Sequence, residues 1–89
     1  MYAARWRKAN ILDNLKRYDE ALAVYHAMLQ EDPRDPWTRH NAAFALTKLG
    51  RYDEALACSD RALAIMDFAT ARQLRDFILK KMAERQAAD

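Results

Sequence analysis

The side chains best suited to chemistry in this 89-residue chain are two histidines and one cysteine. His26 and His40 stand fourteen residues apart, and neither has another histidine or cysteine three or four positions away. A zinc site needs about four ligands, usually at such short spacings, so the sequence predicts no metal site. Cys58 is the sole cysteine and has no flanking base. It cannot form an internal disulfide, and a small packing residue is favoured over a nucleophile.

Two acidic pairs are the other candidates for catalysis, as general acid and base. Asp19 and Glu20 form the first pair, and Asp53 and Glu54 form the second. Each pair opens an apolar-periodic segment, where negative charge offsets the helix dipole, and we expect Asp19 and Asp53 to cap helices. The chain also has no glycine-rich phosphate loop and no dinucleotide fingerprint. The sequence therefore predicts no catalytic site and no cofactor, and the protein is not expected to be an enzyme.

An internal repeat shows which elements position these residues. Residues 17–23 read RYDEALA, and the same seven letters return at residues 51–57, 34 positions later. The same offset aligns Ala9 with Ala43 and Leu12 with Leu46. Such a recurrence means that one supersecondary unit is used twice, each copy burying its apolar face against a neighbour.

Apolar residues within each unit recur at helical spacing, as in the run that contains Ala21, Leu22, Tyr25, Met28 and Leu29. The pattern predicts an all-α protein with one domain over residues 1–89. Two helix pairs span residues 2–34 and 36–68, and a fifth helix over residues 70–87 closes the stack.

Particular residues mark where these helices start and stop. We expect Asp35 to cap the third helix, with Pro36 at its first position, and Gly50 to end that helix in a left-handed conformation. Thr70 and Gln73 have the spacing of a capping box for the fifth helix.

Charge and hydropathy exclude several partner classes. The net charge of +2 is too even to indicate a nucleic-acid surface, and no run of eighteen apolar residues is present to span a membrane. The N-terminal residues lack the apolar run of a signal peptide, so a cytoplasmic location is expected. A basic cluster is interpreted as a solvated helix face, with a phosphate-rich partner as the alternative: Arg5, Arg7, Lys8, Lys16 and Arg17.

Together these features resemble the tetratricopeptide repeat family, whose unit is a 34-residue helix-turn-helix. The matching small, aromatic and turn positions are Ala9, Leu12, Tyr18, Ala21, Tyr25 and Pro33 in the first unit, and Ala43, Leu46, Gly50, Tyr52, Ala55 and Ala62 in the second. The chain departs from the family pattern at Lys16, which stands where the turn glycine is usual, and at Ser59, which replaces the aromatic residue matched by Tyr25. The resemblance implies an α-α superhelix, or helical-repeat solenoid.

The resemblance also implies a function. Repeats of this family form a curved stack whose inner wall holds a peptide or a helix, so a protein-binding scaffold such as an adaptor or co-chaperone is expected. Carried over by position, the inner wall consists of Trp6, Asn10, Asp13, Trp37, His40, Asn41, Phe44 and Arg75. Large aromatic residues at helical spacing are more often core than ligand anchors, so both tryptophans have two interpretations.

Asn10, Asn41 and Arg75 also match three positions of the clamp with which some family members hold acidic chaperone tails, although Trp6 and Ala71 replace its lysines. The general rule that buried amides are satisfied locally favours a structural role for Asn41.

Two other functions stay open. One is a homodimer that pairs exposed end helices, and the other is a segment of a longer repeat array with no activity of its own.

Overall fold

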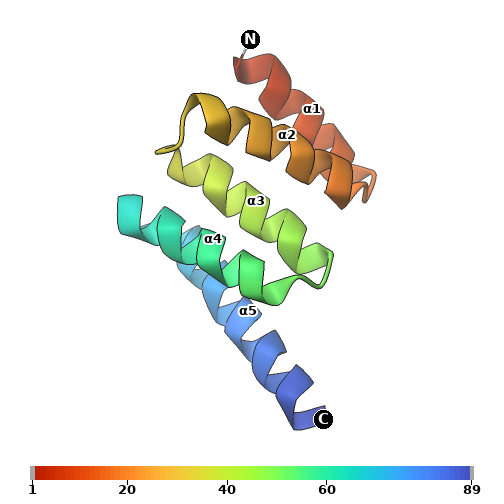
Figure 1. The fold of residues 1–89 in the computed structure, drawn as a ribbon, viewed down its shortest axis with the longest axis vertical. Coiled ribbons are helices and arrows are strands. Elements are labelled where there is room, and N and C mark those ends of the chain that lie inside the picture. Colours follow the sequence, from red (N-terminus) through yellow and green to blue (C-terminus); the bar gives the residue numbers. More distant parts are fainter. Residues whose placement is uncertain (1, 89) are drawn as a thin grey trace.

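The computed structural model describes residues 2–88, and it contains five helices in that range (Figure 1). They are α1 (Tyr2–Asn14), α2 (Tyr18–Glu31), α3 (Pro36–Lys48), α4 (Tyr52–Ile65) and α5 (Ala69–Ala88). Short turns join them, so that successive helices run back and forth as a stack. The predicted all-α helical-repeat fold is confirmed.

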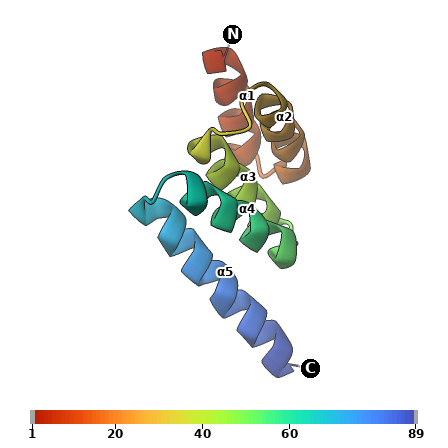
Figure 2. The same ribbon diagram turned by 60° about the vertical axis from the view of Figure 1, so that its left-hand side comes forward.

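The stack is elongated because its last helix is longer than the others. α5 has 20 residues, which corresponds to about 30 Å of helix. It packs mainly on α4 (Figure 2). The contacts continue into its C-terminal half, where Arg85 pairs with Asp53 and lies over the Tyr52 ring. The overall dimensions are 44 × 28 × 19 Å.

The turns inside the two helix pairs have the same geometry. After α3, the Gly50 N–H donates to the Thr47 carbonyl and the Arg51 N–H donates to the Leu46 carbonyl, the paired bonds of a Schellman motif. After α1, the N–H groups of Lys16 and Arg17 make the equivalent bonds. Gly50 has φ 75° and confirms the prediction, and Lys16 adopts φ 61° at the equivalent position.

Helix starts agree with the sequence prediction in one case of four. Asp35 caps α3, because its carboxylate accepts hydrogen bonds from the backbone N–H groups of Trp37 and Thr38, and Pro36 is the first helical residue. The predicted caps Asp19 and Asp53 are wrong. α2 and α4 begin one residue before them, so Arg17 and Arg51 hold the cap positions and make no side-chain cap bond.

The predicted capping box is also wrong, because α5 begins at Ala69 and Thr70 is already its second helical residue. Asp19 and Asp53 lie in the first turns of their helices. They still place negative charge next to the positive end of the helix dipole.

Alanine dominates the core and lets the helices approach closely. The fully buried alanines include Ala9, Ala21, Ala43 and Ala55, which hold the small-residue positions of the two units. Large side chains with less than 2% of their surface exposed fill the spaces between helices, and these include Tyr25, Met28 and Ile78. The 34-residue alignment of small and large residues therefore describes the interior.

Candidate functional site

A hollow of about 510 Å³ lies between α1 and α3, beside the start of α5. From α1 come Asn10 and, three and four positions later, Asp13 and Asn14, so the three share one side of the helix. Five of the eight predicted inner-wall residues line the hollow, and sequence analysis missed Asn14 and Thr70. Its lining consists of Asn10, Asp13, Asn14, His40, Asn41, Phe44 and Thr70.

Asp13 is held in place from behind the hollow by α2. The Tyr25 hydroxyl donates a hydrogen bond of 2.6 Å to Asp13 Oδ2, while buried Oδ1 has no hydrogen-bond partner among the described residues. Burial raises the pKa of Asp13, and the Tyr25 bond lowers it in part. Burial, together with the adjacent carboxylate, raises the pKa of Tyr25 far above its ordinary value. Tyr25 therefore keeps its proton and remains a hydrogen-bond donor at neutral pH. Asp13 Oδ1 remains without a partner among the described residues.

His40 and Asn41 also carry buried polar atoms without partners within the described part of the chain. These atoms are His40 Nδ1 and Asn41 Nδ2, so the local bond expected for the Asn41 amide is not formed there. Burial lowers the pKa of His40, which leaves its imidazole neutral at pH 7. Because buried polar groups in proteins are nearly always paired, such atoms around one hollow are an unusual concentration of unused hydrogen-bonding capacity.

An aromatic cluster borders the hollow on the side of the α4–α5 connection. The Trp37 ring lies 4.4 Å from the Phe68 ring and 6.0 Å from His40, measured between centroids. His40 also meets Phe68 edge-on at 5.6 Å. Sequence analysis missed Phe68, because it precedes the last helix and belongs to no helical periodicity. The cluster fixes the His40 ring and ties the end of α4 to α3.

Neither tryptophan is in the core, although both have helical spacing. Trp37 is 44% exposed and Trp6 is 37% exposed. Trp37 lies at the rim, through the aromatic cluster, and Trp6 does not line the hollow. Three predicted inner-wall residues, Trp6, Trp37 and Arg75, do not line the hollow. Of these, Trp37 contacts a lining residue, because its ring meets that of His40.

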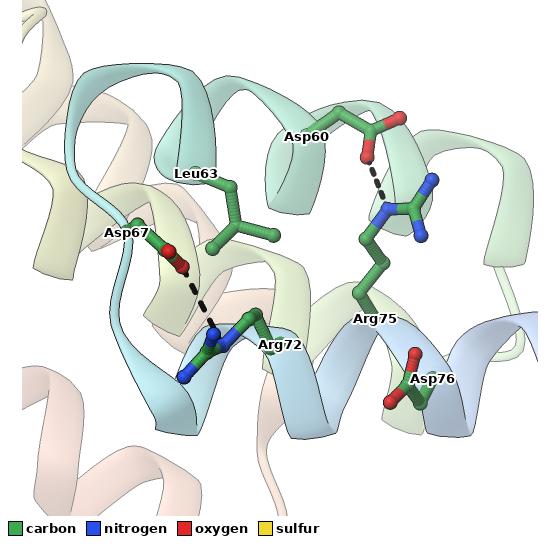
Figure 3. Close-up of a pocket in the computed structure, with 6 residues that line it drawn as sticks. All are labelled: Asp60, Leu63, Asp67, Arg72, Arg75 and Asp76. Atoms are coloured by element: carbon green, nitrogen blue, oxygen red, sulfur yellow. Dashed lines mark hydrogen bonds and ion pairs between the residues drawn. The ribbon is translucent and has the colours of Figure 1, made fainter.

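Arg75 is placed on a different surface. Its guanidinium donates to Asp60 at 2.6 Å and joins α5 to α4 (Figure 3). There it lines a separate pocket of about 520 Å³ with Asp67, Arg72 and other residues. The lining of the α1–α3 hollow contains no lysine or arginine, so Asn10 and Asn41 face it without the basic residue that a carboxylate clamp needs.

Other chemistry finds little support in the described residues 2–88. No cluster of three histidine, cysteine or carboxylate side chains is placed there to hold a metal ion. Burial raises the pKa of the Cys58 thiol, despite nearby Arg39 and Arg61, so it is protonated at neutral pH. In the same range, no helix has the length and apolar character needed to cross a bilayer.

Comparison with known proteins identifies a family. No curated protein matches the chain. The family model described as "Tetratricopeptide repeat" matches residues 14–76. The match extends from the end of α1 into α5 and covers well over half of the chain. It thereby includes both copies of the seven-residue identity and the two equivalent turns, and the chain belongs to the tetratricopeptide repeat family.

Proposed function

We propose that the hollow between α1 and α3 binds a segment of a partner protein, which makes the chain a protein-interaction scaffold. Tetratricopeptide repeats generally mediate protein–protein interactions. The observation that carries the proposal for this surface is the set of three buried polar atoms without described partners: Asp13 Oδ1, His40 Nδ1 and Asn41 Nδ2. A bound segment would supply the missing hydrogen bonds after small side-chain movements.

The chemistry of the lining suggests how such a segment is held. Asp13 accepts hydrogen bonds, and the amides of Asn10, Asn14 and Asn41 both donate and accept, which suits the N–H and C=O groups of an extended backbone. Phe44 adds an aromatic surface for an apolar side chain. Because the lining has one carboxylate and no basic residue, we expect neutral or basic segments to bind better than acidic ones.

A co-chaperone role has weaker support than general adaptor binding. Acidic chaperone tails require positive charge next to the asparagines, and Arg75 is engaged with Asp60 in another pocket.

Among the open alternatives, a homodimer predicts that sedimentation depends on protein concentration. A species that stays monomeric across a wide concentration range would exclude that alternative.

The proposal is tested with peptides selected from a random display library against the immobilised protein. Asn41→Ala should weaken binding of the selected peptides about two- to tenfold, the equivalent of one hydrogen bond. Gln30→Ala, on the exposed side of α2, is the matched control and should leave affinity unchanged.

Asp13→Asn adds a second test. It keeps the shape of the side chain and removes its charge, so it should reduce any preference for basic peptides. Selected peptides that bind both hollow variants as tightly as the unmodified protein would refute the assignment.

A further inference from the structure

We propose that the outer face of α1 is a second docking surface, and that it binds an acidic amphipathic helix of a partner protein. This surface faces away from the hollow and uses other residues, so the inference does not depend on the proposed function. It rests on exposed apolar side chains, on the internal repeat, and on the way charge is distributed among the helices.

The outer face of α1 exposes more apolar surface than a solvated helix needs. Ile11 is 52% exposed and Leu15 is 59% exposed, one helical turn apart. With Leu12 they form the floor of a hollow of about 380 Å³, whose rim is basic: Arg7, Lys8 and Arg17. An apolar stripe with charged edges is the usual receptor for an amphipathic helix.

The second unit shows what covers this face when it is occupied. Ala45 and Leu46 are the equivalents of Ile11 and Leu12 at the 34-residue offset, and they are 0% and 2% exposed. Leu49, the equivalent of Leu15, is 37% exposed, so the cover is complete over the first two positions and partial over the third. α3 packs on both α2 and α4, whereas α1 packs mainly on α2, the counterpart of α4 (Figure 1). Among the described residues, no counterpart of α2 packs on α1. The occupant of the outer face is therefore a helix, seated on α1 as α2 is seated on α3.

Charge identifies the kind of helix. The odd-numbered helices are basic and the even-numbered ones acidic: α1 has three basic residues and one acidic, whereas α2 has three acidic residues and no lysine or arginine. The ion pairs described between helices join the two kinds, as in Arg5 with Glu31 and Arg75 with Asp60.

Two cations at the outer face remain available for such a pair. Arg7 and Lys8 replace Asn41 and Ala42 of the second unit, and neither makes an ion pair within the described chain. An acidic helix would neutralise them.

A second copy of this chain does not offer such a helix. The acidic helices α2 and α4 contain none of the exposed large apolar side chains. At the opposite end of the stack, Phe77 and Leu79 are exposed, but α5 carries five basic residues against two acidic ones. Bringing α5 of one copy to α1 of another would place like charges together, so the geometry points to a different protein.

The test uses a synthetic peptide with the sequence of residues 18–31, which is α2 itself, with blocked ends and a fluorescent label. Fluorescence anisotropy at low salt should show saturable binding to the intact protein. A matched peptide with lysine in place of its three acidic residues should bind at least about tenfold more weakly. The protein variant Ile11→Glu should lose a similar factor, because it places a like charge on the apolar floor.

Matched variants keep the test specific. Leu79→Glu changes an apolar, 38% exposed residue on α5 and should leave binding unchanged. Circular dichroism confirms that each variant is folded. Absence of saturable binding, equal affinity for the lysine peptide, or full binding by Ile11→Glu would each overturn the proposal. Concentration-dependent dimerisation that Ile11→Glu abolishes would assign the face to a second copy, and would also overturn it.

Discussion

Replacing Lys16 with glycine should stabilise the protein, because Lys16 holds a backbone conformation that suits glycine. Its φ of 61° lies in the left-handed region, and Gly50 adopts φ 75° at the equivalent turn of the second unit. Both residues sit between the same pair of Schellman hydrogen bonds. No hydrogen bond or ion pair involving the Lys16 side chain is found within the described chain. The substitution therefore changes backbone strain and little else.

The expected gain follows from two opposing effects. A left-handed conformation costs an L-residue roughly 1–2 kcal/mol, and glycine removes that cost. Glycine also raises the conformational entropy of the unfolded chain, which reduces the gain in unfolding free energy by about 0.5–1 kcal/mol. Taking the middle of each range, the net gain in the free energy of unfolding is about 0.5–1 kcal/mol. For a domain of this size that corresponds to a Tm increase of about 2–8 °C.

Urea and thermal unfolding followed by circular dichroism measure this gain. Lys16→Ala is the matched control, because it removes the long side chain but keeps the strained Cβ, and it should not stabilise. Gly50→Ala is the reverse experiment. A Cβ at position 50 would meet no atom within 4 Å, so the Gly50→Ala variant should lose stability through backbone strain alone. A stabilising Lys16→Ala, or a Lys16→Gly variant less stable than the parent, would refute the reasoning.

Three further predictions concern buried polar groups. Tyr25→Phe should cost about 1.5–3 kcal/mol of unfolding free energy, since it deprives the Asp13 carboxylate of its donor. Because folding raises the pKa of Tyr25, stability should fall as pH rises above about 10, and Tyr25→Phe should lose less over that range; identical alkaline profiles would contradict this. Ser59→Ala should leave stability unchanged or raise it by up to about 1 kcal/mol, because the Ser59 hydroxyl is buried without a partner in the described chain; a clear loss in urea unfolding would argue against it. Folding lowers the pKa of His40, so the unfolded state binds more protons, and stability should fall as pH drops below about 6.5. His40→Gln should flatten that dependence, and an equally steep profile in the variant would contradict the assignment.

The helices were predictable because the repeat overdetermines them. The identity between residues 17–23 and 51–57 fixes the register of both units, and Gly50, Asp35 and Pro36 mark boundaries through conformations that few other residues favour. The starts of α2 and α4, observed at Tyr18 and Tyr52, were predicted too far along the chain because an aspartate near a helix start is ambiguous. It serves as well in the first turn as at the cap, and only the backbone bond from the Ala21 N–H to the Arg17 carbonyl distinguishes the two.

The candidate site was only partly predictable, because one side of it depends on how α5 packs. Residues of α1 and α3 could be assigned to one wall because the resemblance to the tetratricopeptide repeat family implies that the first helix of each unit lines it. Within the described residues α5 packs mainly on α4, where Arg75 pairs with Asp60 and lines a pocket other than the hollow. Phe68 and Thr70 are brought to the site by the connection before α5 and the start of that helix, whose path no periodicity describes.

The two proposed surfaces share one helix, and this connects binding to the stability of the stack. In a repeat protein each helix is stabilised mainly by its neighbours, and α1 packs mainly on α2, where Tyr25 holds Asp13 and Glu31 holds Arg5. A segment in the hollow would join α1 to α3, and an acidic helix on Ile11 and Leu15 would give α1 a neighbour on the side opposite to α2. Either ligand therefore holds α1 in the position that the other requires, so occupancy of one surface should favour occupancy of the other.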